Sequence, residues 1–128
     1  MTEIEKQISL KNPLTLAFIG DAVISLHVRN SLVTQFEKIE TLHQKTAQLV
    51  CAKTQSLVLD KIKDNFTEIE SDIARRAHNA KHKTTPKNQT LGDYRNATAL
   101  EAVVGFNYLI QNQARLNEIL EIVMGESQ

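Results

Sequence analysis

The chain has 128 residues, of which 41% are hydrophobic and 23% are charged, and its 15 basic and 15 acidic side chains cancel. This composition excludes a disordered chain and fits one globular domain with an apolar core. A net charge of zero argues against a protein that is basic over its whole surface, as many nucleic-acid-binding domains are.

The cysteine content and the lack of long apolar stretches indicate where the protein resides. The single cysteine, Cys51, cannot form a disulfide within the chain, which is compatible with a reducing compartment. It lies in the apolar stretch 49–52, and we expect it in the core. The N-terminal residues lack the apolar segment of a signal peptide, and no stretch approaches the 18 apolar residues of a membrane span. We therefore expect a cytoplasmic protein that does not bind membranes.

The first strong structural signal is a helix near the N-terminus. Asn12 as N-cap and Pro13 at the first helical position predict a helix that runs to about Leu32. Its expected apolar face consists of Leu14, Phe18, Ile19, Ala22, Val23 and Leu26. Apolar residues recur at helical spacing in the rest of the chain too, and β-branched alternation is absent. Residues 1–128 are therefore expected to form a single all-α domain of about six or seven helices.

The later helices follow from capping residues and from apolar spacing. Capping boxes that begin at Thr41 and Thr67 predict two helix starts. Pro86, Asn88 and Gly92 predict a loop over residues 81–92. The expected helices after the first are residues 41–50, about 57–62, 67–77, 93–109 and about 116–123.

Charge is distributed unevenly along the chain. Residues 75–95 carry six basic side chains and one acidic side chain, whereas residues 1–74 carry eight basic and ten acidic ones. The basic residues of this segment are Arg75, Arg76, Lys81, Lys83, Lys87 and Arg95, with His78 and His82 between them. Such a segment suits contacts with phosphate groups. The alternative is a solvated loop whose lysines bind nothing.

Two carboxylates lie inside otherwise apolar helices. Asp21 directly follows Gly20, and Glu101 lies four residues before Gly105. Each glycine is suited to a close approach between backbones. Burying a carboxylate is costly unless it is paired or bound to a metal, and the alternative is that each faces solvent or pairs with a structural arginine. If the two helices pack together, the carboxylates could share one Mg²⁺ that is completed by water and phosphate.

Several segments resemble the ribonuclease III family. Residues 18–23 (FIGDAV) resemble the signature helix of ribonuclease III domains, and residues 100–105 (LEAVVG) resemble their second catalytic helix. The segments 75–81, 85–88 and 94–98 resemble the short bacterial form, Mini-ribonuclease III, which has no double-stranded-RNA-binding domain. The resemblance covers about residues 10–124, nearly the whole chain.

The resemblance implies a dimeric, all-helical endoribonuclease that is specific for double-stranded RNA. In the family, the substrate is precursor large-subunit (23S) ribosomal RNA, and the products carry 5′-phosphate and 3′-hydroxyl ends. By the same resemblance, Asp21 and Glu101 would be the catalytic residues and the ligands of Mg²⁺, for which Mn²⁺ could substitute. A ribosomal protein that presents the substrate is a further expected partner.

The basic segment supplies candidates for RNA contacts. Double-stranded RNA is recognised mainly through its backbone and 2′-hydroxyl groups. We expect phosphate contacts from Arg75, Arg76, Lys81 and Lys87, and 2′-hydroxyl contacts from Asn79 and Asn88. Either asparagine could equally be a helix cap or a turn residue.

The sequence departs from full-length ribonuclease III at two acidic positions. Ala17 and Thr98 stand where that enzyme has two further carboxylates. Mini-ribonuclease III shares this reduction, so it supports the subgroup but leaves the number of metals open. It also motivates an alternative, a non-catalytic RNA-binding or ribosome-assembly module on the same fold. A third hypothesis is a purely structural helical dimer.

Overall fold

The computed structural model describes residues 1–81 and 87–125, which form seven α-helices, one short 3₁₀ helix and no strand. The elements are α1 (Glu3–Ser9), α2 (Pro13–Leu32), α3 (Ile39–Val50), α4 (Ala52–Ile62), η1 (Lys63–Asn65), α5 (Glu68–Asn79), α6 (Leu91–Leu109) and α7 (Gln113–Gly125). The all-α prediction is confirmed. None of the helices in these ranges has both the length and the hydropathy needed to cross a lipid bilayer.

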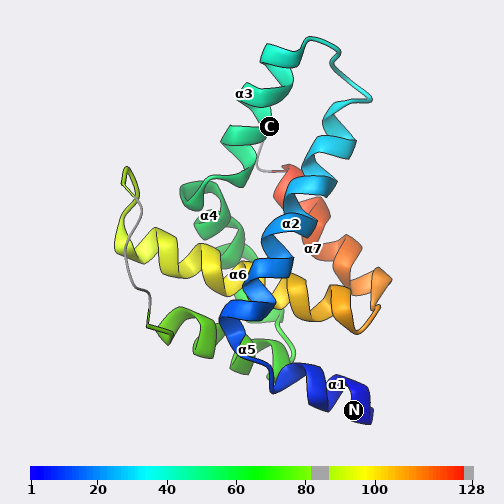
Figure 1. Cartoon of the computed structure of the whole chain (residues 1–128), viewed down its shortest axis with the longest axis vertical. Coiled ribbons are helices and arrows are strands. Elements are labelled where there is room, and N and C mark those ends of the chain that lie inside the picture. The colour runs from blue at the N-terminus through cyan, green and yellow to red at the C-terminus, as the bar shows by residue number, and fades with distance from the viewer. Residues whose placement is uncertain (82–86, 126–128) are drawn as a thin grey trace.

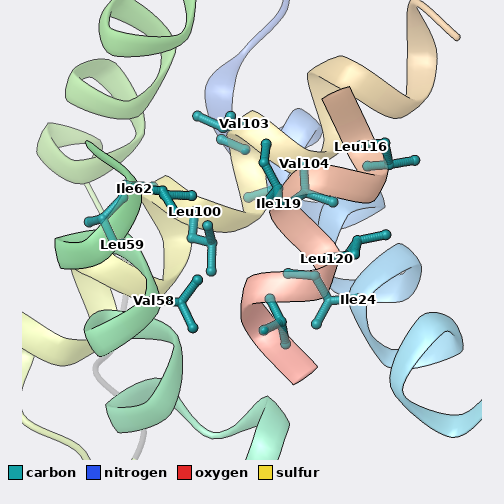
Figure 2. Packing of buried hydrophobic residues seen from close by; sticks show 14 of the residues in the cluster. Ile24, Val58, Leu59, Ile62, Leu100, Val103, Val104, Leu116, Ile119 and Leu120 are labelled. Atoms are coloured by element: carbon teal, nitrogen blue, oxygen red, sulfur yellow. The ribbon is translucent and has the colours of Figure 1, made fainter. Parts of the chain in front are cut away.

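Helix α6 is the centre of the fold. It runs through the middle of the molecule, and α2, α4, α5 and α7 all pack against it (Figure 1). Nearly every residue of its second half is buried, from Ala97 to Asn107. Figure 2 shows Leu100 and Val104 of α6 among side chains of α2, α4 and α7 in the core. A helix that is apolar on all sides in this way is stable only inside a protein.

The predicted caps at two helix starts are confirmed. The Asn12 side chain accepts a hydrogen bond of 2.9 Å from the Leu14 N–H at the start of α2. At the start of α5, the Thr67 hydroxyl accepts from the Glu70 N–H, and the Glu70 carboxylate accepts from the Thr67 N–H. The third predicted cap is wrong. Helix α3 begins at Ile39, two residues before Thr41, and has no side-chain cap hydrogen bond.

The predicted apolar face of α2 is also wrong. The buried residues of α2 are Leu16, Ala17, Gly20, Ile24, Val28 and Leu32. Two members of the predicted face, Phe18 and Leu26, are 78% and 70% exposed. Because α2 carries apolar side chains nearly all round, periodicity does not select a face. The small residues Ala17 and Gly20 select it instead, because they let α6 approach closely.

Two further expectations about local structure need correction. Cys51 is exposed rather than buried, because it stands at the junction where α3 ends and α4 begins. Its neighbours Leu49 and Ala52 are the residues of this stretch that are buried in the core. Helix α1 was not predicted; Thr2 opens it with a capping box that includes Glu5.

Candidate active site

Two glycines bring α2 and α6 into contact through their backbones. Gly20 of α2 lies against the carbonyl group of Glu101, and Gly105 of α6 lies against the carbonyl group of Leu16. A Cβ atom at either glycine would overlap the opposing backbone oxygen. The close approach that the sequence predicts next to each carboxylate is therefore confirmed, and backbone contact sets the spacing of the two helices.

The structure brings the two predicted carboxylates together. Asp21 and Glu101 line one cavity of about 370 Å³ between α2 and α6. The other residues that line it are Leu14, Ala17, Phe18, Tyr94 and Thr98. Asp21 is exposed at this cavity, whereas Glu101 is partly buried.

The carboxyl group of Glu101 has an unusual electrostatic environment. Burial, the negative charge of Asp21 and a hydrogen bond with the Asp21 carboxyl group together raise the pKa of Glu101 to about 9. Burial is the largest of these causes. At neutral pH and without a bound cation, Glu101 therefore holds a proton that it shares in a hydrogen bond with Asp21.

Both departures from the full-length enzyme lie at this cavity. Ala17 and Thr98 line it, and both are buried. The Thr98 hydroxyl donates a hydrogen bond of 2.9 Å to the carbonyl oxygen of Tyr94, one turn earlier in α6. The cavity therefore has two carboxylates, and within residues 1–81 and 87–125 no cluster of three or more His, Cys, Asp or Glu side chains forms a metal site.

The chemistry of this pair suits a hard divalent cation. Mg²⁺ is commonly held by only one or two carboxylates, while water and substrate phosphates complete its coordination. A cation between Asp21 and Glu101 would remove their repulsion and displace the shared proton. The donor set of the cavity supports this fit, because the charged group that acts on Glu101 is a second carboxylate, that of Asp21.

Of the predicted RNA contacts, Arg75 and Arg76 lie on α5 and share one acidic partner. Arg75 Nη2 lies 2.8 Å from one carboxylate oxygen of Asp72, and Arg76 Nε lies 2.9 Å from the other. Arg76 also donates to the carbonyl oxygens of Ser9 and Lys11, so it fastens the connection between α1 and α2 to α5. Most donors of Arg76 are thus used inside the protein, whereas Arg75 is exposed.

The other predicted RNA contacts lie at the two ends of the segment between α5 and α6. Asn79 is the last residue of α5, and Lys81, Lys87 and Asn88 are all exposed. The backbone of Asn88 has a positive φ of 69°, which is typical of an asparagine in a turn. His82 and Lys83 of the basic segment lie outside the described residues. The roles of all six residues in RNA binding remain predictions.

Sequence reasoning missed two features of the structure. Tyr94 lines the carboxylate cavity, and its spacing from Thr98 and Glu101 (four and seven residues) was the available signal. Glu70, considered only as a cap, is 2% exposed and forms an ion pair of 2.9 Å with Arg115. The available signal was that Arg115 is the only basic residue among residues 96–128.

Comparison with known proteins identifies the family. The ribonuclease III domain matches residues 14–112, a span that contains both carboxylates of the cavity. The chain belongs to the ribonuclease III family. This confirms the resemblance seen in the sequence and assigns the chain to a class of endoribonucleases.

Individual relatives support the same assignment over nearly the whole chain. The chain is 45% identical to Mini-ribonuclease 3 of Thermoanaerobacter sp. (strain X514), with 87% of this chain and 79% of that protein aligned. It is 40% identical to Mini-ribonuclease 3 of Staphylococcus aureus, with 94% and 92% aligned. A crystal structure of a protein from Fusobacterium nucleatum superposes with a TM-score of 0.86 at 35% identity, covering 93% of this chain and 96% of that one. The ribonuclease III fold is thereby confirmed.

Proposed function

We propose that the protein is a Mg²⁺-dependent endoribonuclease that cuts double-stranded RNA at the cavity between α2 and α6. The observation that carries this proposal is the pair Asp21 and Glu101, placed together on a ribonuclease III fold. Their position at one cavity and the raised pKa of Glu101 both support a site for a cation. They do not support the alternative in which each carboxylate pairs with a structural arginine. Mn²⁺ could take the same place.

The residues of the chain would hold the metal and the RNA in fixed positions. When bound, the metal would activate water and stabilise the leaving oxygen, giving 5′-phosphate and 3′-hydroxyl ends. Asp21 would hold it from the exposed side of the cavity, and Glu101 would hold it from the buried side after losing its proton. Because the backbones of α2 and α6 touch at Gly20 and Gly105, the two helices that carry these residues are held at a short separation.

For the substrate, we propose precursor large-subunit (23S) ribosomal RNA, processed in the cytoplasm. The exposed residues Arg75, Lys81 and Lys87 can reach the phosphates of an A-form duplex, which is read mainly by shape. Arg76, Asn79 and Asn88 complete the proposed set. A ribosomal protein that presents the RNA belongs to the same proposal.

We also propose that the protein acts as a homodimer through the exposed side of α2. Phe18 and Leu26 are 78% and 70% exposed, and Ala22 lies between them at a spacing of four residues. An apolar row of this kind on a soluble protein marks a surface that another protein covers. Because Phe18 also lines the carboxylate cavity, a second copy on this face would lie next to the site and leave each subunit one strand to cut.

The experiment that tests the function is incubation of the purified protein with a long RNA duplex, with and without Mg²⁺. We expect cleavage only with Mg²⁺, and we expect Asp21→Asn to lower the rate by about 10³-fold or more while the fold is unchanged. Asp60→Asn is the matched control, because Asp60 is exposed on α4 and pairs with Lys63. Full activity of Asp21→Asn would refute the proposal.

The second candidate is a non-catalytic RNA-binding or ribosome-assembly module. The loss of two acidic positions at Ala17 and Thr98 is the observation that favours it. This candidate predicts salt-sensitive duplex binding without any Mg²⁺-dependent cut in the experiment above. Mapped 5′-phosphate and 3′-hydroxyl ends would eliminate it.

A further inference from the structure

Arg95 on α6 is a partly buried arginine whose Nε–H has no hydrogen-bond acceptor among the described residues. Its Nε–H is buried and has no acceptor among residues 1–81 and 87–125. The neighbouring acidic residue, Asp93, is two positions away, and residues at this spacing do not face each other on a helix. A buried N–H donor without an acceptor costs about 1–3 kcal/mol, and more when the group is charged.

The other two partly buried arginines show how this fold treats a structural guanidinium. Arg115 donates two hydrogen bonds, of 2.9 and 3.0 Å, to the Glu70 carboxylate. Arg76 pairs with Asp72 and donates to two backbone carbonyl groups. Each of these arginines holds two helices together. Arg95 makes no comparable contact within the described ranges, so the fold itself does not explain its burial.

The position of Arg95 on α6 lies between two cavities. Thr98, three residues later, lines the cavity of Asp21 and Glu101. Ala99, four residues later, lines a second cavity of about 340 Å³ whose rim includes Arg75 and His78 of α5. Residues three and four positions apart are neighbours on a helix surface, so Arg95 stands between the carboxylate cavity and the basic end of α5.

We propose that Arg95 binds a backbone phosphate of the RNA and holds it between the carboxylate cavity and the end of α5. A guanidinium suits a phosphate because two of its N–H groups can donate in parallel. The proposal rests on the proposed function, since it makes Arg95 a binding residue for the same substrate. It assigns a role to a basic residue outside the six proposed RNA contacts.

The test compares Arg95→Met with wild type in the full chain, because methionine keeps much of the apolar volume and removes the charge. Arg29→Met is the matched control, since Arg29 is exposed on α2 and bonds only to Ser25 in the contacts described. Duplex binding is measured over a range of salt concentrations with Ca²⁺ in place of Mg²⁺, and melting temperature is measured without RNA. Arg95→Lys tests whether charge alone is sufficient.

We expect Arg95→Met to bind the duplex about tenfold more weakly, with a salt slope reduced by about one. We expect its melting temperature without RNA to be equal to that of wild type or higher, because the substitution removes a buried N–H group that has no acceptor among the described residues. Arg95→Lys is expected to retain the salt slope but not the full affinity. A lower melting temperature with unchanged binding would show a structural arginine and overturn the proposal.

Inorganic phosphate separates this proposal from the proposed function. We expect phosphate to raise the melting temperature of wild type and of Arg29→Met, but not of Arg95→Met. If wild type neither binds nor cuts the duplex, the proposed function fails, and the phosphate result still decides whether Arg95 forms an anion site. An equal response of wild type and Arg95→Met, or no response of wild type, would overturn the site.

Discussion

Two glutamates of this protein, the buried Glu70 and the partly buried Glu101, lie in opposite environments. Glu70, on α5, is 2% exposed and receives hydrogen bonds from Arg115, from Asn107 and from the backbone of Thr67. Glu101, on α6, has an acidic residue, Asp21, as its charged neighbour. The same side chain is thus surrounded by donors in one region and by a second acceptor in the other.

The pKa values of the two glutamates shift in opposite directions. Burial acts to raise the pKa of Glu70, but the hydrogen bonds and the charge of Arg115 outweigh it and lower the pKa below its ordinary value. At Glu101, burial and Asp21 act in the same direction and raise the pKa to about 9. The difference separates a carboxylate whose partners lie within the fold from one that, under the proposed function, a bound cation would pair.

The largest expected effect is on catalysis, and it is tested by replacing each of the two glutamates with glutamine. We expect Glu101→Gln to lower the rate of duplex cleavage by about 10³-fold, because a metal ligand is lost. Glu70→Gln, assayed at a temperature at which it is folded, is expected to stay within about threefold of wild type. The measurement is single-turnover cleavage with Mg²⁺. Similar losses in both variants would show that the two glutamates do not differ in this way.

The same two variants should reverse their order in stability. Glu70→Gln removes the buried carboxylate partner of Arg115, which is 18% exposed, and leaves it only the exposed Glu118 as a charged partner. We expect a loss of about 3 kcal/mol in the free energy of unfolding, measured by urea denaturation at pH 7 without metal. Glu101→Gln should show no such loss. A stable Glu70→Gln protein would show that Glu118 and the carbonyl oxygen of Asn65 satisfy Arg115 without the charge of Glu70.

A smaller effect is expected from the backbone contact that places Glu101. Gly20→Ala puts a Cβ atom onto the carbonyl oxygen of Glu101, so α2 must move away from α6. We expect a loss of about 1–3 kcal/mol in the free energy of unfolding together with weaker Mg²⁺ binding, measured by denaturation and by calorimetry. Gly92→Ala is the control, because nothing lies within 4 Å of a Cβ atom there. Normal Mg²⁺ binding by Gly20→Ala would contradict this role of the glycine.

A further expected effect is a pH dependence of stability without metal. The pKa of Glu101 in the folded protein, about 9, lies above its ordinary value of 4.5, so the folded state holds a proton that the unfolded state releases. Its contribution to stability is complete below about pH 4.5 and is lost as the pH rises toward 9. In EDTA, the melting temperature of Glu101→Gln should therefore equal that of wild type near pH 4.5 and exceed it at pH 8. Equal melting temperatures at pH 8 would contradict the raised pKa.

Local signals in the sequence were sufficient for two of the three predicted helix caps. Asn12 with Pro13, and Thr67 with Glu70, determine helix starts through bonds to their own neighbours, so a linear pattern contains the information. The pairing of Asp21 with Glu101 followed from the family resemblance and from the glycine beside each residue. Helix propensity alone gives no information about the distance between two helices.

The errors concern tertiary packing. The buried face of α2 could not be read from its pattern, because Phe18 and Leu26 are as apolar as the residues that face α6. Cys51 was misplaced because a short apolar stretch can span the junction of two helices as well as one helix. The pair of Glu70 and Arg115 joins residues 45 positions apart, and no local pattern connects them.

The contact of Gly20 and Gly105 with opposing carbonyl groups has a consequence for variation in this protein. In most helix pairs, interlocking side chains set the separation, and it drifts when those side chains change size. Here the backbones of α2 and α6 contact each other directly, and this contact sets the separation between the helices that carry Asp21 and Glu101. An exchange of one apolar side chain for another around α6 is therefore expected to change the separation of the two carboxylates less than in a helix pair that is held by side chains alone.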